Sequence, residues 1–305
     1  MTHALAGIYA AALTPLGPDG NFDPDGMLRL LDFLAGRGCH GALILGTTGE
    51  GPSFSIHERT EILRVSREIR LTHPAFRLVA GVGTPSQGDT GALTRVAFDL
   101  GYDAALALPP YYFRNASPEG LYAWFAGILK WDVPEGGVFL GYHIPPVTGV
   151  PLPLDMLARL RDAFPTRFHG IKDSSADAAF AEAAGARFGS ELLILNGTDR
   201  LLTQALGWGA QGAITALANL VSPDLRAVWD AHQSGKRNPA AQARLDAARA
   251  VSEKFPPAPS LLKFLLAEFF EFPHWPVKLP LLPLNDSVMK RARSAWQARG
   301  KMAQE

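Results

Sequence analysis

The sequence has almost no cysteine, no excess of charge of either sign and no long apolar run. Cys39 is the only cysteine among 305 residues, so the chain can form neither an internal disulfide nor a CxxC metal site. Lys+Arg and Asp+Glu number 29 each, which argues against a general binder of nucleic acid or of anionic membranes. No run approaches the roughly 18 apolar residues that span a bilayer. We therefore expect a cytoplasmic protein that binds neither nucleic acid nor membrane.

Apolar residues are nevertheless abundant, at 47% of the chain against 19% charged, which is typical of a globular protein with a large core. The most apolar late stretch, residues 264–272, contains Glu268 and Glu271, so it predicts a buried helix. The apolar N-terminal stretch is broken by Gly7 and Pro15 and has no basic segment before it, which favours a first strand over a signal peptide.

One structural unit repeats along the chain. Eight short apolar runs, which start 21 to 36 residues apart, alternate with segments of helical spacing such as Met27, Leu30, Leu31 and Leu34. Apolar strands that alternate with helices indicate a parallel sheet covered by helices, and eight units favour a (β/α)8 TIM barrel over an open sheet. The runs cover residues 8–13, 42–45, 78–82, 104–108, 138–142, 168–172, 192–195 and 213–217.

The pattern changes after the eighth run. Ser222-Pro223 opens a helical stretch, residues 235–239 break it, and two more helices are predicted around a Pro-rich segment at 273–283. We therefore predict a barrel over residues 1–221 and a C-terminal helical extension over residues 222–305, packed on the barrel without an intervening linker.

The loops that follow barrel strands carry the catalytic groups in this kind of fold. The second run leads into Gly46-Thr47-Thr48-Gly49-Glu50-Gly51, where two hydroxyls lie beside flexible backbone amides. Such a loop suits a substrate carboxylate or phosphate. The alternative is a tight turn in which a threonine caps the next helix.

The sixth run ends in Lys172, the only one of eight lysines in such a position. A lysine at the end of a buried strand is expected to be partly desolvated, which lowers its pKa and leaves free amine to attack a carbonyl and form a Schiff base. The alternative is a surface pair between Lys172 and Asp173.

Two tyrosine positions also follow strands. The fifth run ends in Tyr142, and the fourth leads into Pro109-Pro110-Tyr111-Tyr112. Each tyrosine alone is typical of an amphipathic strand end. Beside Lys172 and the two threonines, however, a phenol that can relay protons indicates a reaction site.

Taken in order, these motifs resemble the signature of the dihydrodipicolinate synthase/N-acetylneuraminate lyase family of class I aldolases, from about residue 7 to residue 295. The matching segments are Gly46-Thr47-Thr48-Gly49-Glu50, Tyr111-Tyr112, Tyr142-x-x-Pro145-x-x-Thr148-Gly149 and Gly170-Ile171-Lys172-Asp173.

The resemblance implies a role for each catalytic residue. Lys172 forms a Schiff base with pyruvate or another 2-oxo acid, whose carboxylate Thr48 and the amides near Gly49 hold. Tyr142 acts as general acid and base, and Thr47 connects it to Tyr112, which in the family reaches into an adjacent subunit. The resemblance also implies a homotetramer, a dimer of dimers, and a reaction that needs neither metal nor organic cofactor.

The residues expected to contact the second substrate differ from those of dihydrodipicolinate synthases and from those of sialic acid lyases. Val147 stands where dihydrodipicolinate synthases carry an arginine that grips a carboxylate of the aldehyde. Sialic acid lyases carry Gly-x-Asp-Glu after the seventh strand, whereas this chain has Gly197-Thr198-Asp199-Arg200, with Ala216 where those lyases have a serine. We expect Asp199 to bind hydroxyls and Arg200 either to bind a distal anion or to face solvent. Gly197 and Ile214 complete the expected substrate contacts.

The sequence therefore predicts a class I lyase that cleaves or forms a carbon–carbon bond in a 2-oxo acid, with pyruvate and an aldehyde as partners. A 2-keto-3-deoxy sugar acid aldolase or dehydratase fits this description. The alternatives are 4-hydroxy-tetrahydrodipicolinate synthase, N-acetylneuraminate lyase and, from another class, a non-catalytic barrel that binds a 2-oxo acid.

Overall fold

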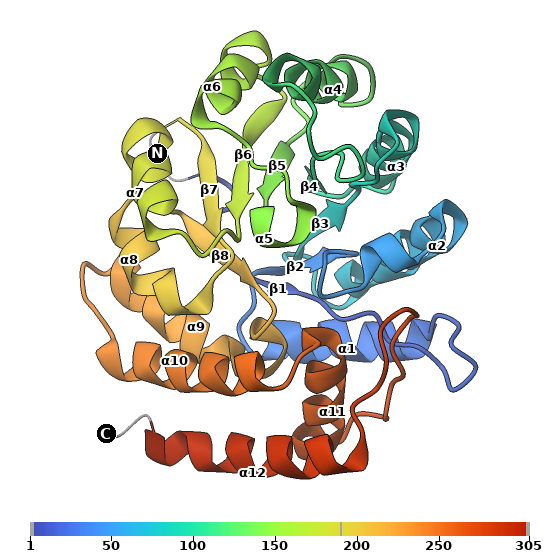
Figure 1. The fold of residues 1–305 in the computed structure, drawn as a ribbon, viewed down its shortest axis with the longest axis vertical. Helices are drawn as coiled ribbons and strands as arrows, with labels where there is room; N and C mark the ends of the chain where they lie inside the picture. Colours follow the sequence, from blue (N-terminus) through green and yellow to red (C-terminus); the bar gives the residue numbers. More distant parts are fainter. Residues whose placement is uncertain (1–2, 190, 303–305) are drawn as a thin grey trace.

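A closed barrel of eight parallel strands forms the centre of the molecule (Figure 1). The computed structural model describes residues 3–189 and 191–302. The strands follow one another around the barrel in chain order, so the predicted (β/α)8 fold is confirmed. They are β1 (Gly7–Ala11), β2 (Gly41–Ile44), β3 (Arg77–Gly81), β4 (Ala104–Ala107), β5 (Phe139–His143), β6 (Phe168–Asp173), β7 (Leu193–Asn196) and β8 (Gly212–Thr215).

The seam between β1 and β8 closes the barrel, with Ile8 opposite Ala213 and Tyr9 opposite Ile214. A Cβ atom on Gly212 would lie 2.0 Å from the carbonyl oxygen of Gly7. Only glycine therefore permits the two strands to approach so closely at this point.

Helices surround the barrel between successive strands (Figure 1). Several begin with a side-chain cap at a residue that ends the preceding loop; Ser55, for example, forms a capping box with Glu58. The surrounding helices are α1 (Pro24–Gly36), α2 (Ile56–Ser66), α3 (Gln87–Asp99), α4 (Pro118–Trp131), α5 (Pro145–Thr148), α6 (Leu154–Ala163), α7 (Ala178–Phe188), α8 (Leu202–Gly207) and α9 (Ala218–Gln233), with short 3-10 turns η1 (Gly51–Ser53), η2 (Arg67–Leu71) and η3 (Asp199–Leu201).

Two hydrophobic cores result from the alternation of side chains along each strand. One face, such as Ile171 on β6, packs against the helices. The other fills the interior of the barrel with residues such as Leu43, Val79 and Leu140, and Tyr142 belongs to this inner cluster. On β6, Lys172 directly follows Ile171, and successive side chains of a strand point to opposite faces. Because Ile171 faces the helices, the Lys172 side chain points into the barrel.

The C-terminal part of the chain continues as three further helices, α10 (Pro239–Lys254), α11 (Ala258–Phe270) and α12 (Asp286–Met302). The prediction of two helices after the break at 235–239 was wrong, because Pro256-Pro257, which lack backbone N–H groups, separate α10 from α11. The predicted boundary after residue 221 falls inside α9, at a kink where Val221 has non-helical dihedral angles. Within the described ranges, no helix has the length and hydropathy needed to cross a membrane.

Candidate active site

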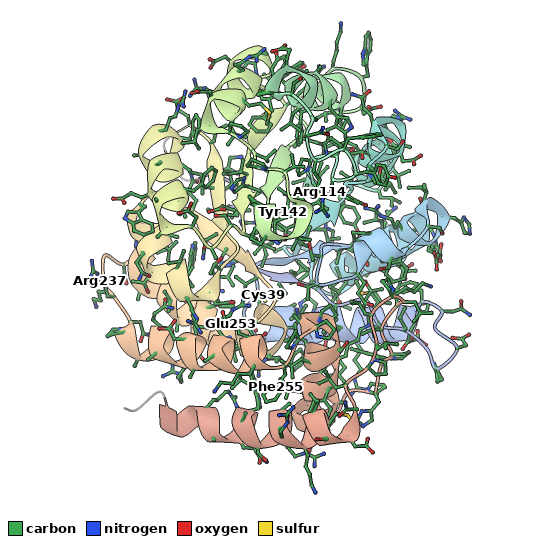
Figure 2. All side chains as sticks on the ribbon, viewed as in Figure 1. Cys39, Arg114, Tyr142, Arg237, Glu253 and Phe255 are labelled. Atoms are coloured by element: carbon green, nitrogen blue, oxygen red, sulfur yellow. The ribbon has the colours of Figure 1, made fainter. Side chains whose placement is uncertain are left out.

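A buried lysine and a buried tyrosine meet at the C-terminal ends of two adjacent strands. Lys172 on β6 and Tyr142 on β5 are register partners, and both side chains are almost fully buried. The Lys172 Nζ atom donates a hydrogen bond of 2.9 Å to the Tyr142 hydroxyl and lies 4.1 Å from the centre of the tyrosine ring. Figure 2 marks Tyr142 near the middle of the ring of strands. The interpretation of Lys172 as one half of a surface pair with Asp173 does not fit this burial.

The surroundings of Tyr142 favour its phenolate form. Burial raises the pKa of the phenol, but the charge of Lys172 and hydrogen bonds from Lys172, Thr47 and Ser174 outweigh this effect and lower the pKa below its ordinary value. Thr47 also donates to the phenol oxygen, with its Oγ1 atom 3.5 Å away. A tyrosine that accepts two hydrogen bonds is well placed to take and return a proton.

The loop after β2 is held in an unusual backbone conformation. Leu45 and Glu50, which flank residues 46–49, both adopt left-handed dihedral angles, with φ of 62° and 57°. Non-glycine residues in this region cost about 1–3 kcal/mol each and persist only where the surrounding structure fixes them. Thr14 contributes to this by donating a 2.7 Å hydrogen bond to the Gly49 carbonyl. The loop is therefore a fixed platform rather than a simple capping turn.

This platform presents hydrogen-bond donors that the protein itself does not use. Among the described residues, no hydrogen bond involves the backbone N–H of Thr47 or of Thr48, or the Thr48 hydroxyl. Adjacent backbone N–H groups and a hydroxyl form a suitable pocket for a carboxylate. A narrow cavity lies beside Thr47, and its lining includes Leu45, Gly46, Leu106, Leu108 and Tyr142.

Tyr112 lies apart from this group in the single chain. It is on the loop between β4 and α4, its side chain is 76% exposed, and its ring packs edge-to-face on that of Phe113, which is 72% exposed. No hydrogen bond in the described part of the chain joins Tyr112 to Thr47 or Tyr142.

Two of the predicted substrate residues after β7 face the C-terminal extension. The fully buried Asp199 carboxylate forms an ion pair with Arg249 of α10, and its second oxygen has no partner in the described structure. Arg200 forms a 2.7 Å ion pair with Glu253, which Figure 2 marks on α10. In this structure both side chains are paired with α10, and their roles toward substrate remain predictions.

The other predicted substrate residues lie at the strand ends and the barrel rim. The Gly197 N–H donates to the Asp173 carbonyl, and a Cβ atom on Gly197 would lie 1.9 Å from the Ser174 hydroxyl oxygen, so this close loop contact requires glycine. Ile214 is buried inside the barrel on β8, whereas Val147 is 55% exposed on α5. No cluster of metal-ligating side chains occurs within residues 3–189 and 191–302.

The sequence reasoning missed one further ionic group next to the site. Glu50, the last residue of the Gly46–Glu50 motif, forms a buried ion pair with Lys263 of α11. A signal was available, because Lys263 stands alone in the apolar stretch from Leu261 to Leu266, and a buried charge needs a partner.

A closed barrel with a lysine–tyrosine pair at its strand ends and a threonine loop beside them defines a class of lyases, and the comparisons with known proteins give its family. The model of the dihydrodipicolinate synthetase family matches residues 4–299. A DapA-like lyase of Chloroflexus aurantiacus is 40% identical over 95% of this chain and 96% of its own length. A 4-hydroxy-tetrahydrodipicolinate synthase 2 of Streptomyces coelicolor is 36% identical, over 75% of this chain and 73% of its own length.

Solved structures give the same result. The dihydrodipicolinate synthase of Agrobacterium tumefaciens superimposes with a TM-score of 0.85 at 32% identity and covers 96% of this chain and 98% of its own. The chain belongs to the dihydrodipicolinate synthetase family. The predictions of family, fold and lyase class are confirmed, and the identity of the substrate stays open.

Proposed function

We propose that this protein is a Schiff-base lyase in which Lys172 binds pyruvate, or the pyruvate half of a larger 2-oxo acid. The single observation that carries the proposal is the buried 2.9 Å contact between Lys172 Nζ and the Tyr142 hydroxyl, beside the unused donors of Thr47 and Thr48. The lysine supplies the nucleophile, the tyrosine transfers the protons, and the threonine loop holds the carboxylate.

The proposed reaction balances with these groups alone. Tyr142, in the phenolate form that its surroundings favour, takes a proton from Lys172 Nζ, and the free amine adds to the C2 carbonyl. Tyr142 passes that proton to the carbonyl oxygen. It then transfers a second proton from the nitrogen to the same oxygen, which leaves as water. The protonated imine then accepts the electron pair of the C3–C4 bond as this bond breaks, while Tyr142 takes the proton of the C4 hydroxyl, which yields an enamine and an aldehyde. Tyr142 returns this proton to C3, and addition of water to the imine releases pyruvate and restores Lys172. The reverse sequence forms the bond.

Borohydride trapping tests this proposal directly. Reduction in the presence of saturating pyruvate should add a 1-carboxyethyl group, the mass of reduced pyruvate less one water, to the intact protein, and peptide mapping should place the adduct on Lys172. Absence of any adduct in the wild-type protein would refute the Schiff-base mechanism. A barrel that binds pyruvate without reacting with it would show binding by calorimetry but no adduct.

For the second substrate, we propose a 2-keto-3-deoxy sugar acid or a related 2-oxo acid. Support comes from Val147, an exposed apolar side chain on α5 that offers no charge-assisted contact to a substrate carboxylate. A screen of 2-keto-3-deoxy acids for pyruvate release would identify the substrate.

The names of two relatives favour a second candidate, 4-hydroxy-tetrahydrodipicolinate synthase activity. Condensation of pyruvate with aspartate semialdehyde, followed spectroscopically, tests it. Lack of product from a preparation that forms the pyruvate adduct would exclude this candidate and leave the Schiff-base proposal intact.

We also propose that the protein assembles as a homotetramer and acts in the cytoplasm. Tyr112 and Phe113 support the assembly, because two adjacent aromatic rings that are more than two-thirds exposed form a surface that a second copy can cover. Light scattering should then give the mass of four chains. A monomer whose turnover still depends on the Tyr112 hydroxyl would contradict the shared-site role of this residue.

A further inference from the structure

We infer that Lys263, in the C-terminal extension, is a positioning residue for the reaction: through the Glu50 carboxylate it fixes the loop that carries Thr47 and Thr48. This inference rests on the proposed function, because it assigns to α11 a role in holding the carboxylate pocket of that same site.

The first link is the buried ion pair. Lys263 Nζ lies 2.6 Å from Glu50 Oε1, and the two side chains are 1% and 0% exposed. Lys263 also donates a 2.7 Å hydrogen bond to the carbonyl of Pro276, and the Lys278 backbone N–H donates one of 2.5 Å to the other Glu50 oxygen. Both carboxylate oxygens are therefore bound by the extension, so Glu50 is not available to substrate.

The second link is the backbone of the loop. Glu50 is one of the two left-handed residues that flank residues 46–49, and its N–H donates a 3.2 Å hydrogen bond to the Thr47 carbonyl. A left-handed glutamate persists only where other contacts hold it. The contacts that hold its side chain come from α11 and from the segment that follows it.

The third link is the position of the extension. The segment between α11 and α12 rises toward α2 in Figure 1, and Lys278 Nζ forms a 2.7 Å ion pair with Glu58 of that helix. The extension thus contacts both the loop that ends at Glu50 and the helix α2 that follows this loop. The physical consequence is that Thr47 keeps its contact with Tyr142, and the unused N–H groups keep their direction.

The control for this idea lies on the same helix. Ser260 is buried on α11 and donates a 2.8 Å hydrogen bond to the Leu282 carbonyl, so it also ties α11 to the following segment but does not reach Glu50. Ser260→Ala loosens the extension and spares the clamp, which we define as Lys263, Glu50 and the Lys278 N–H.

The test compares Lys263→Met, Glu50→Gln and Ser260→Ala with the wild type, at a temperature well below each unfolding midpoint. We expect both clamp variants to raise KM for pyruvate and to slow adduct formation on Lys172 by about 10-fold or more, since small displacements of positioning groups have effects of this size. Amide hydrogen exchange of the peptide covering residues 46–51 should rise in the clamp variants and not in Ser260→Ala.

The outcomes distinguish an error in the proposed function from an error in the positioning role of Lys263. If the wild type forms no adduct, the proposed function is wrong. If the wild type forms the adduct and a folded clamp variant forms it at the wild-type rate and pyruvate dependence, the positioning role is wrong. Equal losses in Ser260→Ala would also overturn it, since general loosening would then suffice. If Lys263→Met does not fold, Glu50→Gln, which keeps an acceptor for the Lys278 N–H, decides the matter alone.

Discussion

Two lysines are buried in this protein to nearly the same degree, yet their surroundings differ in kind. Lys172 is 3% exposed and its one described hydrogen bond goes to the Tyr142 phenol. Lys263 is 1% exposed and is held by the Glu50 carboxylate and the Pro276 carbonyl. Burial lowers the pKa of Lys263, and the Glu50 carboxylate opposes this shift.

The difference shows that burial alone does not identify a catalytic lysine. An amine that attacks a carbonyl needs a lone pair and a partner that can exchange protons, which a phenol provides. A lysine bound between a carboxylate and a carbonyl uses its N–H groups as donors and serves to fix the two segments. Substitutions at these residues, and a titration of the tyrosine, test this difference between the two lysines.

The largest effect should come from Lys172→Met. Loss of the proposed nucleophile should abolish the pyruvate adduct and reduce turnover by roughly 10⁴-fold or more, with little loss of stability because Thr47 still donates to Tyr142. Mass analysis after borohydride treatment and steady-state assays measure both. The matched control is Lys130→Met, an exposed lysine on α4. An adduct that survived in Lys172→Met would place the nucleophile elsewhere.

Substitution of Lys263, in contrast to that of Lys172, should greatly lower the stability of the protein. Lys263→Met leaves a buried carboxylate without its cation, which should cost about 3–5 kcal/mol in free energy of unfolding. Urea denaturation measures this cost. The double variant Lys263→Met/Glu50→Gln should recover most of the loss, because no unpaired charge remains. If the single and double variants were equally unstable, the lost packing of Lys263 and not its charge would be the cause.

Removal of the phenol oxygen should have an intermediate effect. Tyr142→Phe keeps the ring beside Lys172 but removes the hydroxyl to which we assign proton transfer, so kcat should fall by about 10²–10³-fold. Steady-state kinetics with a saturating 2-oxo acid measure this change. Tyr102→Phe, which removes a buried hydroxyl bonded to the Leu63 carbonyl, serves as the control and should leave kcat unchanged.

The smallest effect should be the early ionisation of Tyr142 as pH rises. Tyr142 has a lowered pKa, whereas burial raises the pKa of Tyr9 to about 12 and also raises that of Tyr102. Tyr142 should therefore ionise before Tyr9 and Tyr102 in an ultraviolet titration, and its step should disappear in Tyr142→Phe.

The sign of the linked stability change follows from the same shift. Between the folded-state pKa of Tyr142 and the ordinary value near 10, the unfolded chain binds the extra proton. The contribution of this group to stability should therefore grow as pH rises through that window, and it is lost as pH falls through the folded-state pKa. If the free energy of unfolding fell with rising pH in both the wild type and Tyr142→Phe, other groups would dominate its pH dependence.

The sequence predicted the barrel well because buried parallel strands are nearly continuous apolar runs. All eight runs correspond to strands, with ends displaced by at most two residues, as at 213–217 against Gly212–Thr215. Lys172 and Tyr142 could be found for the same reason, since each ends such a run.

Contacts between distant segments could not be predicted in this way. Nothing in the spacing of Asp199 and Arg249, or of Glu50 and Lys263, shows that the extension places these charges together. The position of Tyr112 is a different case, because its expected contact would be made with another chain. Periodicity reports which face of an element is buried, whereas pairing across the fold depends on how complete elements pack.

The distance along the chain between Glu50 and Lys263 has a consequence for synthesis of the protein. The loop is made early and its partner 213 residues later. A ribosome that has just finished β8 has translated every residue of the proposed reaction centre, but not the helix that fixes the threonine loop. Under the clamp inference, the nascent chain acquires a competent centre only after Lys263 and Lys278 have been translated. A product that stopped after β8 would therefore carry Lys172 without an organised place for the substrate.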